Sequence, residues 1–201
     1  MKKLFVVLLM LSILHEVAAQ RAGAFRLSTD LGAAIPKDGG IGALFNLEPQ
    51  ILVKDNLAFG IRMGVAGLAK DVTYYSIPED YDGEVSANVS VSGTVNYYFN
   101  NGSSRVAPYI GAGFGYYGLS SIDVEEGNID DSDVGDLEAE FAWAPMVRVG
   151  IELAKFRLGA EYNFVPKSNL QNLNGQVIGE AINEYFGFTL GVTIGGGKWG
   201  K

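Results

Sequence analysis

The stretch SANVSVSGTVNYYF, residues 86–99, decides the fold that this sequence predicts. Polar and apolar residues alternate within it: Asn88, Ser90, Ser92, Thr94 and Asn96 against Val89, Val91, Val95, Tyr97 and Phe99. A period of two predicts a β-strand with two unlike faces. At roughly 3.3 Å per residue and about 45° of tilt, such a strand covers about 30 Å, the thickness of a bilayer's hydrocarbon core.

The same alternation recurs along the chain. It predicts further strands at residues 25–33, 41–53, 57–70, 106–119, 140–153, 156–164 and 185–194. The links after the second, fourth and sixth strands are short, whereas those after the third, fifth and seventh are long and polar (71–85, 120–139 and 167–183). An even number of strands with short turns on one rim and long loops on the other is typical of membrane barrels. The predicted fold is therefore all-β: an eight-stranded antiparallel up-and-down transmembrane β-barrel, with both termini on the short-turn side.

Alternation alone does not say which face meets lipid, because a soluble lipocalin-like barrel shows the same pattern reversed. The polar face carries Gly, Ser, Thr and Asn with charges of both signs: Arg26, Arg62, Arg148 and Arg157 against Asp30, Glu48, Glu152 and Glu161. Small residues and self-neutralising charges suit a narrow, filled interior. Aromatic residues gather toward strand ends, as interfacial girdles do: Tyr97, Tyr98, Phe99, Tyr109, Tyr117, Phe141, Trp143, Phe164 and Tyr185. These features favour an apolar face turned to lipid.

The first residues have the pattern of an export signal. Lys2 and Lys3 precede an apolar run from Leu4 to Leu14, and Val17-Ala18-Ala19 offers a small-residue cleavage site. We expect residues 1–19 to be a cleaved signal peptide and residues 20–201 to form the single barrel domain. A retained transmembrane helix is the alternative, but the apolar run is too short to span a bilayer.

Composition excludes several classes of function. The chain has no cysteine, and its one histidine, His15, lies inside the expected signal peptide. The mature chain therefore has no Ser-His-Asp triad, no Cys-His pair and no thiolate or imidazole zinc site. The formal charge of −8 argues against a nucleic-acid partner, because phosphate binding needs clusters of Lys and Arg. We assign no catalytic, cofactor-binding or metal-binding residue and expect no cofactor and no enzymatic activity.

Four features have both a functional and a structural interpretation. Gly113-Phe-Gly115-Tyr-Tyr-Gly118 matches a dinucleotide-binding fingerprint, but no helix is expected after it, so barrel packing is favoured. The acidic stretch Asp123 to Glu140 could hold calcium, but its spacing does not fit an EF-hand, which favours a solvated loop. Glu152 and Glu161 could act as an acid–base pair, although the arginines on the same face favour structural ion pairs. Likewise, the interior Arg and Glu residues could line a selective pore or plug the barrel, and eight strands favour the plug.

With these features the chain resembles the small eight-stranded outer-membrane β-barrel family, which includes OmpA-like and OmpX-like barrels and the outer membrane protein beta-barrel domain proteins common in Bacteroidetes. The resemblance covers Arg21 to about Gly195 and rests on the hairpin rhythm and on Gly-aromatic strands such as Tyr109-Ile-Gly-Ala-Gly-Phe-Gly-Tyr-Tyr117. One departure is the C-terminus. Family members usually end on an aromatic residue that helps the insertion machinery, whereas this chain ends in Gly195-Gly-Gly-Lys-Trp199-Gly-Lys201, where Trp199 could take that role.

The resemblance implies location in the cell outer membrane, with outer-membrane lipid, the barrel-insertion machinery and a surface or envelope protein as partners. We expect a monomer with a structural, envelope-integrity or adhesion-like role through its long acidic loops. Two alternatives stay open. One is a small passive channel, which predicts single-channel conductance that changes when Arg62 or Arg148 is replaced. The other is a soluble, secreted lipocalin-like barrel, which predicts solubility without detergent.

Overall fold

The computed structural model describes residues 22–74, 81–100, 102–122, 140–171, 177–197 and 199–200. The expected signal peptide and its cleavage site lie outside these residues and stay predictions. So does most of the acidic stretch from Asp123 to Glu140. Within the described ranges, no helix has the length and apolar character needed to cross a membrane.

The described chain forms ten β-strands in one sheet. Eight of them correspond to the strands that alternation predicts, and the two shortest belong to a hairpin between β7 and β10. The strands are β1 (Phe25–Pro36), β2 (Gly42–Lys54), β3 (Leu57–Tyr74), β4 (Tyr81–Tyr98), β5 (Val106–Ile122), β6 (Glu140–Leu153), β7 (Phe156–Asn163), β8 (Ser168–Gln171), β9 (Val177–Ala181) and β10 (Tyr185–Gly195).

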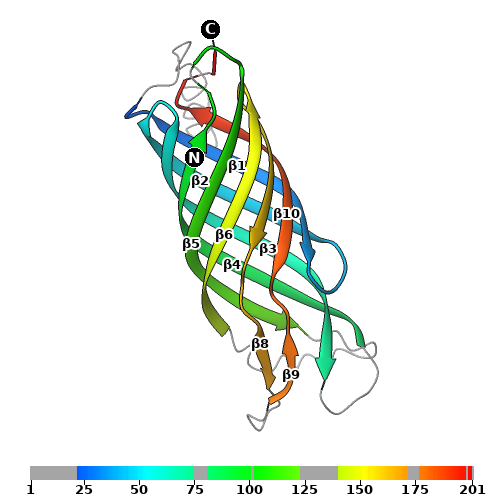
Figure 1. Ribbon diagram of the computed structural model, residues 1–201. Helices are drawn as coiled ribbons and strands as arrows, with labels where there is room; N and C mark the ends of the chain where they lie inside the picture. The colour runs from blue at the N-terminus through cyan, green and yellow to red at the C-terminus, as the bar shows by residue number, and fades with distance from the viewer. Residues whose placement is uncertain are drawn as a thin grey trace, which may run out of the picture.

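The sheet closes on itself. Each strand from β1 to β7 pairs antiparallel with the next, and β7 pairs with β10. The circle is completed by β10 pairing with β1, from Arg26 opposite Gly195 to Pro36 opposite Tyr185. Figure 1 shows the long strands wound steeply around a common axis. The predicted eight-stranded antiparallel barrel is confirmed.

The long-loop end differs from the prediction. Strands β3, β4 and β5 reach beyond their predicted ends, to Tyr74, Tyr81 and Ile122. The third long link, predicted as an unstructured polar connection over 167–183, contains the β8–β9 hairpin. Strand β9 pairs with β3 at Thr73 and Tyr74, on the edge that β2 leaves unpaired past Gly67. The hairpin thus supplies backbone partners at the end of the extended β3, which would otherwise be an open edge there.

Both ends of the described chain lie at the short-turn end, as predicted. The backbone nitrogen of Ala22 donates to Asp55 Oδ1 in the β2–β3 turn at 2.9 Å. Gly200 packs so closely on the β4–β5 link that a Cβ there would lie 2.9 Å from the backbone nitrogen of Arg105. The third short connection is the predicted two-residue turn Ala154-Lys155, where Ala154 takes the left-handed φ of 56° that tight hairpins require.

The two faces of the barrel wall have opposite chemistry, in the sense that the sequence predicts. The outer face exposes large apolar side chains over its whole height, among them Leu31, Ile61, Val91, Phe114, Val149, Leu158 and Leu190. The inner face buries polar and charged side chains. This orientation is the reverse of a soluble barrel.

The predicted aromatic girdle is partly wrong. Five of the nine aromatic residues are exposed on the outer wall: Tyr97, Phe99, Phe141, Trp143 and Phe164. The other four are buried inside the barrel: Tyr98, Tyr109, Tyr117 and Tyr185. Inside, a tyrosine combines a ring that fills space with a hydroxyl that finds a polar partner. Tyr98 thus donates to Glu152 Oε1 at 3.1 Å, and Tyr117 donates to Asn163 Oδ1 at 2.9 Å.

Candidate functional site: a charge-neutral lumen closed at both ends

Eight charged side chains point into the lumen, because they fall on the inward positions of their strands. All eight are buried, and they are the set that the sequence predicts: Arg26, Arg62, Arg148, Arg157, Asp30, Glu48, Glu152 and Glu161. Four positive and four negative groups cancel. A buried charge is tolerated only when it is paired and hydrogen-bonded, so the contacts of each group decide what the lumen can do.

Glu48 of β2 accepts hydrogen bonds at both of its carboxylate oxygens. Arg148 of β6 donates to both oxygens of Glu48: NH1 donates to Oε2 at 2.8 Å, and NH2 donates to Oε1. Thr94 also donates to Oε1, at 2.5 Å. The remaining Nε of Arg148 donates to Asn96 Oδ1 at 2.8 Å. This two-point, charge-assisted contact fixes both side chains in one geometry.

Two further pairs lie on either side of this centre. Arg62 of β3 hydrogen-bonds Glu161 of β7, and Asn163 donates to the second oxygen of Glu161 at 3.0 Å. Nearer the short turns, NH2 of Arg26 donates to both oxygens of Glu152, at 2.6 and 2.5 Å. The possible acid–base pair of Glu152 and Glu161 is therefore divided between two separate ion pairs, as the structural interpretation expects.

The Arg148–Glu48 and Arg62–Glu161 ion pairs cross the lumen instead of linking neighbouring strands. Arg148 stands directly opposite Glu161 in the β6–β7 register, yet each bonds to a residue across the barrel. Strands β2 and β6 are separated by three strands in either direction around the barrel, and so are β3 and β7. These two pairs thus connect opposite walls of the barrel.

Arg157 of β7 is held differently. Its NH1 lies 3.8 Å from Asp30 Oδ2 and 3.7 Å from Glu48 Oε2, and its Nε lies 3.6 Å from Glu152 Oε1. Among the described residues, neither nitrogen has a partner within hydrogen-bond distance. The guanidinium carbon sits 5.0 Å from the centre of the Tyr109 ring. Coulombic attraction to three carboxylates and a cation–π contact therefore hold this side chain.

Buried apolar side chains form a cluster toward each end of the lumen. The cluster toward the long loops consists of Ala34, Leu44, Ala66, Leu68, Tyr117, Leu119, Ala144, Val165 and Tyr185. The cluster toward the short turns consists of Leu52, Ala58, Tyr98, Ala107, Tyr109 and Trp199. The charged layer is thus enclosed between two apolar layers, and one of these contains a residue from the C-terminal tail.

Inward glycines make room for these bulky side chains. The Tyr109 ring lies against Gly150, where a Cβ would come within 2.6 Å of the tyrosine hydroxyl. In the fingerprint-like motif, Gly113 and Gly115 face Thr94, Met146 and Ser92 in the same way, and the chain continues as strand β5. The packing interpretation of this motif accounts for its glycines. No group of three or more acidic or histidine side chains suited to a metal ion occurs within the described ranges.

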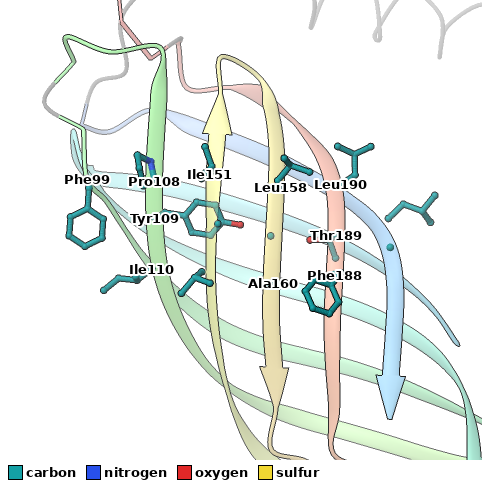
Figure 2. Close-up of a pocket in the computed structure, with 15 residues that line it drawn as sticks. Phe99, Pro108, Tyr109, Ile110, Ile151, Leu158, Ala160, Phe188, Thr189 and Leu190 are labelled. Carbon is teal, nitrogen blue, oxygen red and sulfur yellow. The ribbon is translucent and has the colours of Figure 1, made fainter. Parts of the chain in front are cut away.

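An apolar groove lies on the outer wall, not in the lumen. Figure 2 shows it spanning β5, β6, β7 and β10, with Ile110, Leu158 and Leu190 among the side chains that line it. Its volume is about 760 Å³. The outward-facing lining is apolar and carries no charged group that would recognise a head group, so the groove is part of the surface that meets acyl chains.

A closed barrel with an apolar outer wall and a polar, filled interior is a membrane-spanning β-barrel, since closure satisfies every backbone group of the wall without water. The chain belongs to the family described as "Outer membrane protein beta-barrel domain", whose match covers residues 4–186. It is an integral protein of the outer membrane, as the sequence predicts, and sits in that lipid bilayer.

Solved structures agree on the fold. Neisserial surface protein A (NspA) is 17% identical over 86% of this chain and 98% of its own, with a TM-score of 0.59. The outer membrane protein OprG from Pseudomonas aeruginosa is 11% identical over 89% of this chain and 99% of its own, also with a TM-score of 0.59. At these identities the likeness shows the fold alone. No curated protein matches the chain.

Outer-membrane barrels place short turns in the periplasm and long loops outside the cell. The turns at 55–56 and 154–155 therefore lie at the periplasmic end, and the β8–β9 hairpin lies at the extracellular end. The outer-membrane location and the charged lumen together overturn the soluble lipocalin-like alternative, which needs an apolar ligand cavity.

Proposed function

We propose that this protein is a closed structural barrel, without enzymatic activity, that supports the cell envelope and presents its long loops for adhesion-like contact at the cell surface. The filled lumen carries the proposal. Three cross-lumen ion pairs lie between two apolar layers, so the barrel supports its own wall and offers no route for a solute. The specific function of the protein would then depend on its loops, because function in such folds lies in the parts attached to the scaffold.

The charge of the loops indicates the partner. Residues 123–139 contain eight acidic residues and no basic one: Asp123, Glu125, Glu126, Asp130, Asp131, Asp133, Asp136 and Glu138. A surface segment of one sign attracts partners of the opposite sign over distances of about a Debye length, roughly 10 Å at moderate salt. The partner best suited to this segment is therefore a basic surface or envelope protein.

A loop exchange tests the surface role. Residues 123–139 are replaced by a Gly/Ser segment of equal length, and a matched variant keeps these residues but converts their eight carboxylates to Asn and Gln. Both barrels should keep heat-modifiable mobility in gels. Both should lose the binding of whole cells to immobilised basic protein, and the parent should lose it as salt is raised. Unchanged binding by either variant would overturn the surface role.

A conductance measurement tests the closed lumen and separates it from the passive-channel alternative. Purified protein in a planar bilayer should show no single-channel steps. The channel alternative is favoured by the looser setting of Arg157, which is held without hydrogen bonds from its Nε and NH1. Discrete steps in the parent, altered by Arg157→Gln or Arg148→Gln, would establish a channel and refute the closed barrel.

A further inference from the structure

The C-terminal tail leaves the wall and turns into the lumen. Pairing of β10 with β1 ends at Gly195. Gly195, Gly196 and Gly197 then take φ values of 80°, 69° and 77°, which residues with a side chain rarely adopt. A Cβ on Gly196 would also lie 2.3 Å from Arg26 Cγ. The three glycines thus form a sharp inward turn that few other sequences could make.

The turn delivers Trp199 into a pocket at the periplasmic end of the lumen. Its side chain is almost fully enclosed, with the residue 3% exposed. The indole Nε1 donates to Glu152 Oε2 at 2.6 Å. The indole ring lies 5.0 Å from the Tyr98 ring and 5.9 Å from the guanidinium carbon of Arg26. The pocket therefore supplies an acceptor, an aromatic neighbour and a cation, each matched to one property of indole.

Two contacts outside the pocket tie the tail down. Lys155, in the β6–β7 turn, donates from Nζ to the carbonyl of Gly195 at 2.6 Å and also to that of Gly197. Gly200 lies against the β4–β5 link, where a Cβ would be 2.9 Å from the carbonyl carbon of Ser104. None of these contacts is a strand pairing. The tail is therefore held as a ligand is held, separately from the sheet.

The pocket exists only in the closed barrel. Its walls come from Arg26 on β1, Tyr98 on β4 and Glu152 on β6, three strands that are not neighbours in the sheet. These side chains meet once β10 has paired with β1. The site therefore cannot bind the tail before closure, whereas it can bind it afterwards.

We propose that the periplasmic end of the lumen is a binding site for an indole-bearing peptide, and that the chain's own C-terminal segment, residues 196–201, is its built-in ligand. It docks after barrel closure and locks the periplasmic end. This inference stands apart from the role of the long loops. It also bears on the expected contact of Trp199 with the insertion machinery: in the folded barrel the indole faces the lumen, so that contact, which remains a prediction, would have to precede docking.

Fluorescence separates a docked from a free tail, because the chain has two tryptophans in opposite surroundings. Trp143 is 63% exposed on the outer wall, and Trp199 is buried in the lumen. Trp143→Phe leaves only Trp199, and Trp199→Phe is the matched control that leaves only Trp143. In vesicles, Trp199 should resist quenching by aqueous acrylamide and by brominated lipid, whereas Trp143 should be quenched by brominated lipid. Acrylamide quenching of Trp199 as strong as in urea would overturn the proposal.

Complementation tests whether the tail behaves as a ligand. A chain ending at Gly195 is refolded from urea into vesicles, with or without a synthetic peptide of residues 196–201. The truncated barrel should lose its heat-modifiable form at a lower temperature, and the peptide should restore it. A peptide carrying Trp199→Ala should not restore it. Equal rescue by both peptides, or no shift on truncation, would refute the site.

The full-length variant Trp199→Ala covers the case in which the truncated chain does not fold. It should show the same downward shift in melting temperature as truncation, and the parent peptide in trans should restore part of it. A full-length variant that melts like the parent would likewise refute the lock.

Discussion

The two ends of the lumen are closed by different physical means. At the periplasmic end, Glu152 accepts hydrogen bonds from Arg26, Tyr98 and Trp199, so closure depends on directional bonds and on a tail brought from the C-terminus. At the extracellular end, closure is mostly the packing of aliphatic groups such as Leu44, Leu68 and Val165. Directional closure specifies one arrangement, whereas aliphatic packing tolerates exchange of similar volumes. The ends should therefore respond differently to substitution.

The largest expected effect is at the periplasmic end. Glu152→Ala removes the carboxylate and leaves Arg26 buried without its partner, which should lower the free energy of unfolding by about 3–5 kcal/mol. Urea titration of the protein in vesicles, followed by tryptophan emission, measures the loss. Glu152→Gln keeps the shape and an acceptor for Trp199, so its loss should be smaller. Equal stability of Glu152→Ala and the parent would show that the two ends do not differ in this way.

A smaller effect is expected at the extracellular end. Leu68→Ala leaves a cavity in the aliphatic cluster and should cost about 2–5 kcal/mol, whereas the volume-conserving Leu68→Met should cost less than about 1.5 kcal/mol. The same titration measures both variants. If Leu68→Met lowered the free energy of unfolding as much as Leu68→Ala, the packing at this end would require one particular side chain. The two ends would then not differ in how they respond to substitution.

Added volume sharpens the comparison further. Gly150→Ala places a Cβ 2.3 Å from the backbone oxygen of Leu158 and 2.6 Å from the Tyr109 hydroxyl, so it should cost about 1–3 kcal/mol. Gly67→Ala is the control, because a Cβ there meets nothing within 4 Å. Melting temperatures of the two variants in one detergent should differ clearly. Equal melting temperatures of the two variants would mean that the Tyr109 ring moves aside for the added methyl group at little cost in stability.

The smallest effect concerns the extracellular rim. Glu184 accepts from the Tyr162 hydroxyl at 2.6 Å and from Lys37 Nζ at 3.3 Å. These bonds hold the pKa of Glu184 below its usual value. A lowered pKa contributes stability that is complete above the unfolded-state value and is lost as the pH falls through the folded-state value. The melting temperature of the parent should therefore fall slightly more in acid than that of Glu184→Gln. If the melting temperatures of the parent and the variant changed equally with pH, the contacts of Glu184 would contribute nothing to stability.

Alternation along the chain was enough to predict the barrel and to place the eight charges on one face, because a period of two assigns every residue of a strand to one side. The residue types on that face and the aromatic residues near strand ends then predicted which side meets lipid. It could not predict partners. Which arginine meets which glutamate depends on the tilt of the strands, and this sets Arg148 against Glu48 across the barrel instead of against its register partner Glu161.

Other features could not be predicted from the sequence, again for physical reasons. Tyr98 and Tyr109 are of the residue type found in aromatic girdles, but their strand positions face inward. Gly150 and Gly159 leave room there for the Tyr109 ring. The β8–β9 hairpin is too short to stand out from a polar link. The docking of Trp199 depends on left-handed glycines and on a pocket made by three separate strands. In this segment the sequence shows only a run of three glycines, and such a run has no periodic pattern from which a structure could be predicted.

The protein's charges fall into two groups: those enclosed in the lumen and those exposed to the surrounding medium. Mobile ions screen charges over about 8–10 Å of water at moderate salt, but they cannot enter between two apolar layers. Changes in the salinity around the cell should thus alter the reach of the acidic loops and leave the cross-lumen ion pairs untouched. Under the proposed surface role, salt would therefore change the contacts of the loops without changing the ion pairs that connect the walls of the barrel.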